Sequence, residues 1–354
     1  MDRVEDTVVR ASFASDNTAP ATPEVMEALV VANRGPQPAY GKDEITARLE
    51  RRFADLFEHE VAVFPVATGT AANALALSAC TTPWGLIYCH RLAHVHEHEA
   101  GAPEFYSGGA RLVALDGPDG KLALAALQQE LDAAGFGVVH ESQPQAVTIT
   151  QASEAGTLYR IEEIKAIADL VHARGMKLHM DGARFANAAA ALGAAPADLT
   201  WRAGVDIISF GATKNGALAA EAVIAFDPAL GLSLAFRRKR AGHLLSKQRY
   251  ASAQLEAGLI DGRWLAWARH ANAMAARLAQ GLTALGCASL DFPVEANEIF
   301  VRLPEKVLAG LEADGFAFHR RPAPNQQLIR LVTSWNSATE GIDGFLARAQ
   351  HHAR

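Results

Sequence analysis

Val205-Asp206-Ile207-Ile208-Ser209-Phe210-Gly211-Ala212-Thr213-Lys214-Asn215-Gly216 is the stretch that decides how this chain is expected to fold. Its first half is apolar and β-branched, as in a buried strand, and its second half is a run of small residues around one lysine. A loop lysine is usually solvated, but here the small neighbours let another molecule approach Lys214 closely, and Thr213 adds a hydroxyl. An amine in such a pocket loses its proton at modest cost, as attack on a carbonyl group requires.

Two further sites are expected at the same edge of the fold. Asp181 and Arg184 follow a short strand expected at 177–180, and Thr68-Gly69-Thr70 opens an alanine-rich helix. Asp181 could cap a helix, or it could keep the ring nitrogen of a bound pyridine protonated. Arg184 could be a surface charge, or its planar guanidinium could bind a substrate carboxylate through two hydrogen bonds. The free N–H groups of a helix start suit a phosphate, and the motif is neither a Rossmann nor a P-loop fingerprint. Together these sites match the needs of pyridoxal phosphate (PLP).

The sequence alternates short apolar strands with helices from about residue 60 to 226. We expect strands at 61–66, 85–89, 110–115, 146–150, 177–180, 205–210 and 221–226, and helices at 70–80, 122–134 and 161–174. Strands without polar alternation predict a mostly parallel sheet covered on both faces, with ligands beyond its carboxyl ends.

The pattern changes after about residue 235 to long alanine- and leucine-rich helices, followed by strands at 298–303 and 328–333. We therefore predict an α/β protein with three parts. They are an N-terminal tail (1–13), a large domain with a mostly parallel central sheet (14–240) and a smaller C-terminal α+β domain (241–354).

Composition narrows the function classes. The 354 residues are 50% hydrophobic and 20% charged, with a net charge of -6, so we expect no nucleic-acid partner. No apolar run is long enough to cross a bilayer, and the charged start at 1–6 does not resemble a signal peptide. Three cysteines far apart suggest free thiols. We expect a cytoplasmic protein without a membrane partner.

Histidines cluster between residues 90 and 98. Alternate histidines with carboxylates can chelate zinc, which leaves open a zinc hydrolase with Lys214 as a bystander. If the segment is helical, His94 and His98 share a face and His96 points away. We expect no bound metal, and one imidazole stacked on a pyridine ring instead.

Taken together, these residues resemble the threonine aldolase branch of the fold-type-I PLP enzymes, in the beta-eliminating-lyase-like family. The resemblance extends from about residue 15 to 335, and its most specific pieces are His179 to Asn187 (HMDGARFAN), Thr213-Lys214 and the segment at 93–101. It implies catalytic roles for Lys214, His94 and Asp181.

The resemblance also implies the binding residues. For the cofactor these are Thr68, Gly69, Thr70, His94, Asp181, Arg184, Thr213, Lys214, Lys247 and Arg249, the last two often reaching across a subunit interface. For the substrate they are Ser15, Arg184, Arg330 and His98.

The activity implied is cleavage of a β-hydroxy-α-amino acid (L-threonine, L-allo-threonine or phenylserine type) to glycine and an aldehyde, in a homodimer or homotetramer with active sites at the interface. Many members carry Glu-Asn-Thr-His-Asn after the strand near residue 150, and that histidine assists the substrate hydroxyl. Here the stretch is Thr150-Gln151-Ala152-Ser153-Glu154-Ala155-Gly156, with Ser153 nearest the histidine, as in low-specificity and phenylserine-type members. The base stays open among His94, His98 and an ordered water.

Other functions are also compatible with these residues. A β-eliminating lyase or an aminotransferase-like enzyme would share the cofactor site. A protein of this fold without catalysis, serving assembly or regulation, is a third reading.

Overall fold

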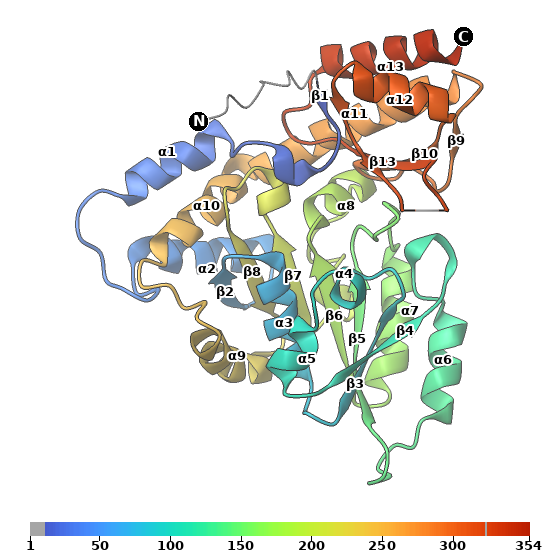
Figure 1. The fold of residues 1–354 in the computed structure, drawn as a ribbon. Coiled ribbons are helices and arrows are strands. Elements are labelled where there is room, and N and C mark those ends of the chain that lie inside the picture. Colours follow the sequence, from blue (N-terminus) through green and yellow to red (C-terminus); the bar gives the residue numbers. More distant parts are fainter. Residues whose placement is uncertain (1–10, 323) are drawn as a thin grey trace, which may run out of the picture.

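The computed structural model describes residues 11–322 and 324–354, so the charged start at 1–6 and most of the expected tail lie outside the described residues. The centre of the fold is a seven-stranded sheet in the order β2-β8-β7-β6-β5-β3-β4 (Figure 1). Its strands are β2 (Ala62–Val66), β3 (Gly85–His90), β4 (Arg111–Leu115), β5 (Gln143–Thr150), β6 (Lys177–Gly182), β7 (Ile207–Gly211) and β8 (Glu221–Ala225). The strands from β7 to β4 are parallel to one another, and β8 runs against both its neighbours. The predicted mostly parallel sheet is confirmed.

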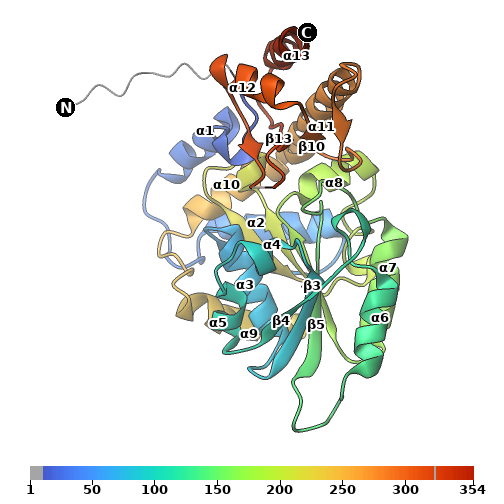
Figure 2. The same cartoon turned by 45° about the vertical axis from the view of Figure 1, so that its right-hand side comes forward.

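Helices cover both faces of this sheet, as Figures 1 and 2 show. One face packs against α3 (Gly69–Cys80) and α9 (Pro228–Arg240), and α5 (Ala102–Ser107) lies against α3. The other packs against α2 (Glu44–Phe57), α6 (Leu124–Ala133), α7 (Ile161–His172) and α8 (Phe185–Leu192). Every residue of β7 and β8 is buried because both faces are covered, which explains why these strands are mostly apolar, with Ser209 and Glu221 as exceptions.

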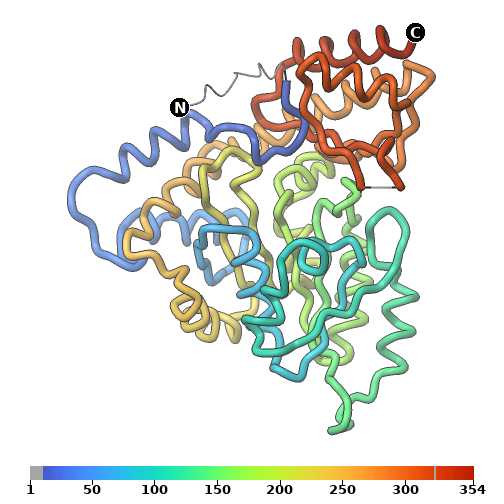
Figure 3. The backbone as a smooth tube through the Cα atoms, in the orientation of Figure 1, coloured from blue at the N-terminus to red at the C-terminus, as the bar shows by residue number. Residues whose placement is uncertain are grey.

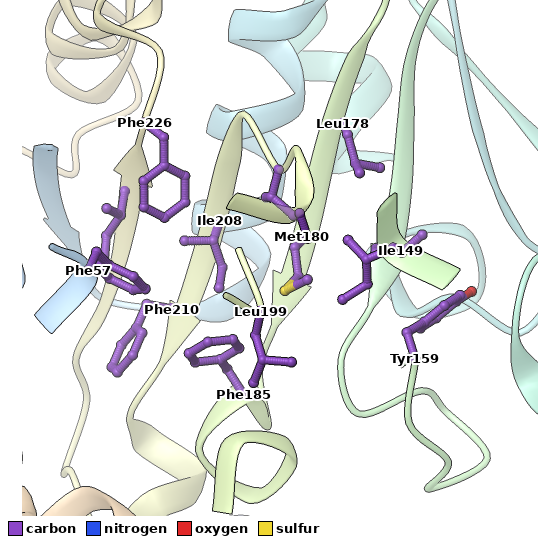
Figure 4. Close-up of a cluster of buried hydrophobic side chains, with 14 of the residues drawn as sticks. Phe57, Ile149, Tyr159, Leu178, Met180, Phe185, Leu199, Ile208, Phe210 and Phe226 are labelled. Carbon is purple, nitrogen blue, oxygen red and sulfur yellow. The ribbon is translucent and has the colours of Figure 1, made fainter. Parts of the chain in front are cut away.

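Aromatic side chains fill the second of these layers. Phe57, Phe185, Phe210 and Phe226 lie close together between α2, α8 and the sheet (Figure 4). Phe57 meets Phe226 edge to face at 5.1 Å between ring centroids. This packing fixes the carboxyl end of β7, immediately before the lysine turn.

The small domain has its own core. Its antiparallel sheet has the order β12-β13-β10-β9 and consists of β9 (Ser289–Leu290), β10 (Glu298–Arg302), β12 (His319–Arg320) and β13 (Leu328–Val332). It packs against α11 (Arg263–Thr283), α12 (Glu305–Ala313) and α13 (Thr339–Ala353). The predicted α+β character is confirmed.

The described part of the expected tail is built into this small domain. β1 (Ala11–Ser12) pairs in parallel with β11 (Phe316–Ala317), and Phe13 meets Phe345 edge to face at 5.3 Å. Figure 3 shows this first described segment beside the C-terminal part of the chain. Ala11–Phe13 is therefore a structural element and not a tail.

Helix α10 (Arg249–Leu259) packs against α1 (Pro23–Ala32) and α2 of the large domain, and its Ala251 and Leu255 belong to the large core. We therefore propose a domain boundary within α11, later than the predicted position at residue 241. No helix among the described residues is long and apolar enough to cross a membrane.

Candidate active site

Two adjoining cavities lie beyond the carboxyl ends of β6 and β7. The inner cavity, of about 370 Å³, is lined by Thr68, Gly69, Thr70, Asp181, Thr213 and Glu221 among others. The outer cavity, of about 450 Å³, is lined by Ser15, His98, Arg184 and Arg330 among others. Asn17, His94, Glu154 and Lys214 line both. Most of the predicted site residues therefore surround one continuous space.

Lys214 lies in a short turn, Thr213–Asn215, that connects β7 to the antiparallel strand β8. Asn215 Nδ2 donates to the Trp264 carbonyl at 2.9 Å, and the Ala212 N–H donates to Glu221 Oε2 at 2.8 Å. Gly216 ends the turn at φ +95°, where a Cβ would lie 2.4 Å from Thr22 Cγ2. The turn is thus held on both sides, with the lysine side chain at the junction of the cavities.

Glu221 is a buried acid beside this lysine. Burial raises its pKa to about 7, against the hydrogen bonds from Thr213 and Ala212 and the charge of Lys214, which lower it. The group therefore changes its protonation near neutral pH at the edge of the inner cavity.

Asp181 ends β6 inside the inner cavity. Its Oδ1 accepts from the Ala183 N–H at 3.0 Å and its Oδ2 accepts from Asn73 Nδ2 at 2.9 Å. Asn73 Nδ2 also donates to Glu99 Oε1 at 2.8 Å, and that oxygen accepts from His94 Nδ1 at 2.8 Å. A continuous hydrogen-bonded chain, Asp181–Asn73–Glu99–His94, therefore connects the predicted ring-nitrogen partner with the predicted stacking histidine.

Within this series of hydrogen bonds, the pKa values of both His94 and Glu99 are raised. The hydrogen bond to Glu99 raises the pKa of His94, and burial raises the pKa of Glu99. Asn73 Oδ1 and Glu99 Oε2 are buried without a hydrogen-bond partner among the described residues.

The helix start at Thr68-Gly69-Thr70 forms another wall of the inner cavity. Thr68 caps α3 by accepting from the Ala71 N–H at 3.1 Å. The first N–H groups of a helix have no intrahelical acceptor, and a Cβ on Gly69 would meet nothing within 4 Å. The wall is therefore an open cradle for an anion.

Arg184 is buried at the base of the outer cavity. Its Nε and Nη2 donate to Asp16 at 2.8 and 3.1 Å, and its Nη1 forms an ion pair with Glu298 at 3.0 Å. Burial raises the pKa of Asp16, but the charges of Arg184 and Lys214 and the hydrogen bonds outweigh it, so this pKa lies below its usual value. The buried acids Asp16 and Glu298 therefore fix the position of the Arg184 guanidinium, which is predicted to bind a carboxylate.

Arg330 is the more open arginine. Its Nη2 donates to the Ala14 carbonyl at 3.3 Å, and its Nη1 lies 3.8 Å from Glu298 Oε1. Its Nε is buried without a hydrogen-bond partner among the described residues. Ser15, next to Ala14, accepts from the Asn17 N–H through its Oγ. Ser15 and Arg330 therefore lie together in the outer cavity.

Lys247 and Arg249 do not line either cavity in this chain. Lys247 is exposed, and Arg249 Nε donates to the Ala32 carbonyl at the end of α1. Their predicted contact with a cofactor stays a prediction that depends on a second subunit.

The histidine cluster is dispersed among separate partners. The His94 and His98 rings lie 5.6 Å apart on one side, as the helical spacing predicts, whereas His96 bonds to the Arg91 carbonyl and His90 to the Gly117 carbonyl. No group of three or more possible metal ligands comes together among the described residues. Among the described residues, the histidine segment therefore does not supply the set of metal ligands that a zinc hydrolase would need.

Five acidic or amide residues of the site were not singled out from the sequence: Asn73, Glu99, Glu154, Glu221 and Glu298. Asn73 did carry a signal, since it is an amide in an otherwise alanine- and leucine-rich helix. The acids carried none, because isolated carboxylates near loops are ordinarily solvated.

The beta-eliminating lyase family matches residues 12–306 of this chain. The low specificity L-threonine aldolase of Pseudomonas aeruginosa is 42% identical over 330 residues, which cover 93% of this chain and 94% of the relative. A second low specificity L-threonine aldolase, from a Pseudomonas species, is 43% identical, with 87% of this chain and 88% of the relative covered. The structure of Leishmania major threonine aldolase matches with a TM-score of 0.91 at 28% identity, covering 97% of this chain and 100% of that one.

Proposed function

This chain belongs to the beta-eliminating lyase family, and we propose that it is a PLP-dependent aldolase that cleaves threonine-type β-hydroxy-α-amino acids to glycine and an aldehyde. The relatives named low specificity L-threonine aldolase support this, since they match over nearly the whole chain. The observation that carries the proposal is the position of Lys214. Its amine lies between a cavity with an anion cradle and Asp181, and a cavity with Ser15 and two arginines.

The residues present fit the cofactor. An inner cavity of about 370 Å³ is within the usual range for a small-molecule site. The open cradle at Gly69 and the two unpartnered buried oxygens, Asn73 Oδ1 and Glu99 Oε2, leave room and polar groups for a ligand. When bound, PLP supplies an electron sink for the bond that breaks at the substrate α-carbon.

We propose that Lys214 binds the carbonyl carbon of PLP and that Thr68, Gly69, Thr70 and Thr213 bind its phosphate. Asp181, which accepts two hydrogen bonds and lines the inner cavity, would pair with the ring nitrogen. His94, whose ring is oriented by its hydrogen bond to Glu99, would lie against the ring face. Fixed partners of this kind hold the reacting groups without further rearrangement.

The substrate carboxylate would bind between Ser15 and Arg330, beside Arg184. Asp16 and Glu298 hold Arg184 rigidly, so its position does not depend on the substrate. Binding one end of the substrate this way orients the bond between its α- and β-carbons relative to the cofactor. His98 lines the same cavity.

The outer cavity of about 450 Å³ exceeds the needs of threonine alone. The Pseudomonas relatives are named as low-specificity enzymes. We therefore propose that this chain also accepts more than one β-hydroxy amino acid, L-allo-threonine and phenylserine types included.

The test begins with the visible absorption spectrum of the purified protein, followed by borohydride reduction and peptide mapping. The expected result is a yellow protein with a pyridoxyl group on Lys214, which the Lys214→Ala variant lacks. L-Threonine should then give glycine and acetaldehyde. A 2-oxo acid with ammonia would instead support a β-eliminating lyase, and a colourless protein that takes up no PLP would overturn the proposal.

We also propose a homodimer or homotetramer with active sites at the interface. Exposed Lys247 is available to a second subunit, and exposed Leu232 and Phe236 on α9 offer apolar surface nearby. Light scattering coupled to gel filtration tests this. A cytoplasmic location, which the free thiols Cys80, Cys89 and Cys287 support, is tested by cell fractionation.

A further inference from the structure

The loop after β5 offers one side chain to the active site. Every residue from Gln151 to Tyr159 is buried except Glu154. Ser153, the residue expected nearest the family's histidine, is 0% exposed and bonds through its Oγ to Thr157 Oγ1 at 2.7 Å. Ser153 therefore supports the loop, and the side chain that enters the cavities is that of its neighbour.

Internal hydrogen bonds hold this loop on both sides of Glu154. The Ala155 and Thr157 N–H groups both donate to Ser153 Oγ, each at 3.2 Å. Gln151 closes the loop, since its amide accepts from the Tyr159 N–H at 3.0 Å and donates to the Tyr159 carbonyl at 2.9 Å. A carboxylate on such a support has a defined position.

Glu154 lines both cavities, together with Lys214 and His94. Its charge contributes to the raised pKa of His94, after the larger effect of the Glu99 hydrogen bond, and it acts on Arg184 as well. None of the hydrogen bonds or ion pairs of the described residues engages its carboxylate. Glu154 is thus an acid that faces the place where the substrate must lie.

The other candidate bases are less suited to accept a proton. His94 already uses Nδ1 for Glu99, and its raised pKa favours the protonated ring. Ser153 is buried and bonded. His98 lies in the outer cavity only, beside the His94 ring.

We propose that Glu154 is the catalytic base that accepts the proton of the substrate's β-hydroxyl group during cleavage. The assignment rests on the proposed aldolase function. The O–H bond breaks as its proton passes to the Glu154 carboxylate, and the C–O bond becomes the C=O bond of the aldehyde. The bond between the α- and β-carbons breaks, and the α-carbon keeps the electron pair and takes up one proton. The protons balance, so no further reactant is needed.

The test compares two reactions of the PLP-loaded protein. Cleavage of L-threonine and L-allo-threonine needs a base for the hydroxyl. Exchange of the α-proton of glycine in D₂O, followed by NMR, needs the cofactor and the carboxylate site but no such base. Glu154→Gln is expected to lower kcat for cleavage by roughly 100- to 10,000-fold. It should leave glycine exchange and cofactor absorbance within about threefold of wild type.

Glu154→Asp should recover part of the cleavage activity, and Glu162→Gln, on the exposed side of α7, serves as the matched control with unchanged activity. Normal cleavage by Glu154→Gln would overturn the assignment. So would an equal loss of cleavage and glycine exchange, because Glu154 would then act in binding. A wild-type protein that exchanges glycine but cleaves no β-hydroxy amino acid would overturn the proposed function itself.

Discussion

Asn73 donates a hydrogen bond to Asp181 at 2.9 Å, although 108 positions separate the two residues. The same nitrogen donates to Glu99, so one amide connects two buried carboxyl groups. Asn73→Ala should leave both without this donor, at a cost of roughly 1–3 kcal/mol. We expect PLP to bind about 10- to 100-fold more weakly, which absorbance titration of the cofactor-free protein measures.

Asn187→Ala is the control for that measurement. It removes another buried amide, which donates to Asn272 between α8 and α11. The Asn187→Ala variant should be less stable than wild type, while its affinity for PLP should stay close to that of wild type. Equal PLP affinity in Asn73→Ala and wild type would contradict a role for the amide bridge.

The two arginines of the outer cavity should respond differently to substitution. Arg184→Ala leaves Asp16 and Glu298 buried without their cation, so we expect the free energy of unfolding to fall by about 3–5 kcal/mol. Arg330→Ala should keep most of its stability and raise KM for L-threonine, because Arg330 is partly exposed and lies 3.8 Å from Glu298. Denaturant unfolding and steady-state kinetics of both variants test this contrast, which equal losses of stability would contradict.

Glu221 gives stability a defined pH dependence. Its pKa is about 7 in the folded protein, against an ordinary value of 4.5, so the folded state binds this proton more tightly than the unfolded chain does. Its contribution to stability is therefore complete below about pH 4.5 and is lost as the pH rises through about 7, by at most about 3 kcal/mol.

Glu221→Gln keeps an acceptor for the Ala212 N–H and cannot ionise. Relative to wild type, the stability of this variant should increase as the pH rises from about 4.5 to about 7 and stay constant above that. Urea unfolding of the cofactor-free proteins across this range measures the difference. A difference that does not change with pH would show that Glu221 titrates normally.

Phe13 should matter far more than its position near the N-terminus suggests. It is 2% exposed in the small-domain core, so Phe13→Ala should lower the free energy of unfolding by about 3–5 kcal/mol. Phe105→Ala, at a residue that is 78% exposed, should change it little. Similar unfolding midpoints for both variants would contradict the packing of Phe13 in the core of the small domain.

Local patterns were sufficient to predict most of the large domain. The strand expected at 205–210 is β7, which spans Ile207–Gly211, and the helix expected at 161–174 spans Ile161–His172. The two-residue strands β1, β9, β11 and β12 were missed, because their pairing depends on distant partners and leaves no periodicity.

The site was predictable where topology alone brings residues together. Asp181 lies near the end of β6 and Lys214 follows β7, and the carboxyl ends of these adjacent parallel strands meet at one edge of the sheet. The buried acids were not predictable, since Glu298 reaches Arg184 from another domain. At 153–154 the sequence could not show which of two neighbouring side chains enters the cavity, because these residues lie in a loop after β5, where no periodic pattern sets the direction of a side chain.

The pairing of β1 with β11 also constrains how the protein is made. Ser15 and Asp16 follow β1 directly, yet β1 has no partner strand until residues 316–317 have been synthesised. On the ribosome, the sheet of the large domain can assemble first, while the segment at 11–16 waits for a partner strand that is synthesised after that whole domain. A nascent chain stopped within α12 would therefore contain the turn with Lys214. It would lack Arg330 and the β11 partner that positions the segment with Ser15, so the outer cavity would be incomplete. Catalytic competence should then appear only after β11 has been synthesised and has paired with β1.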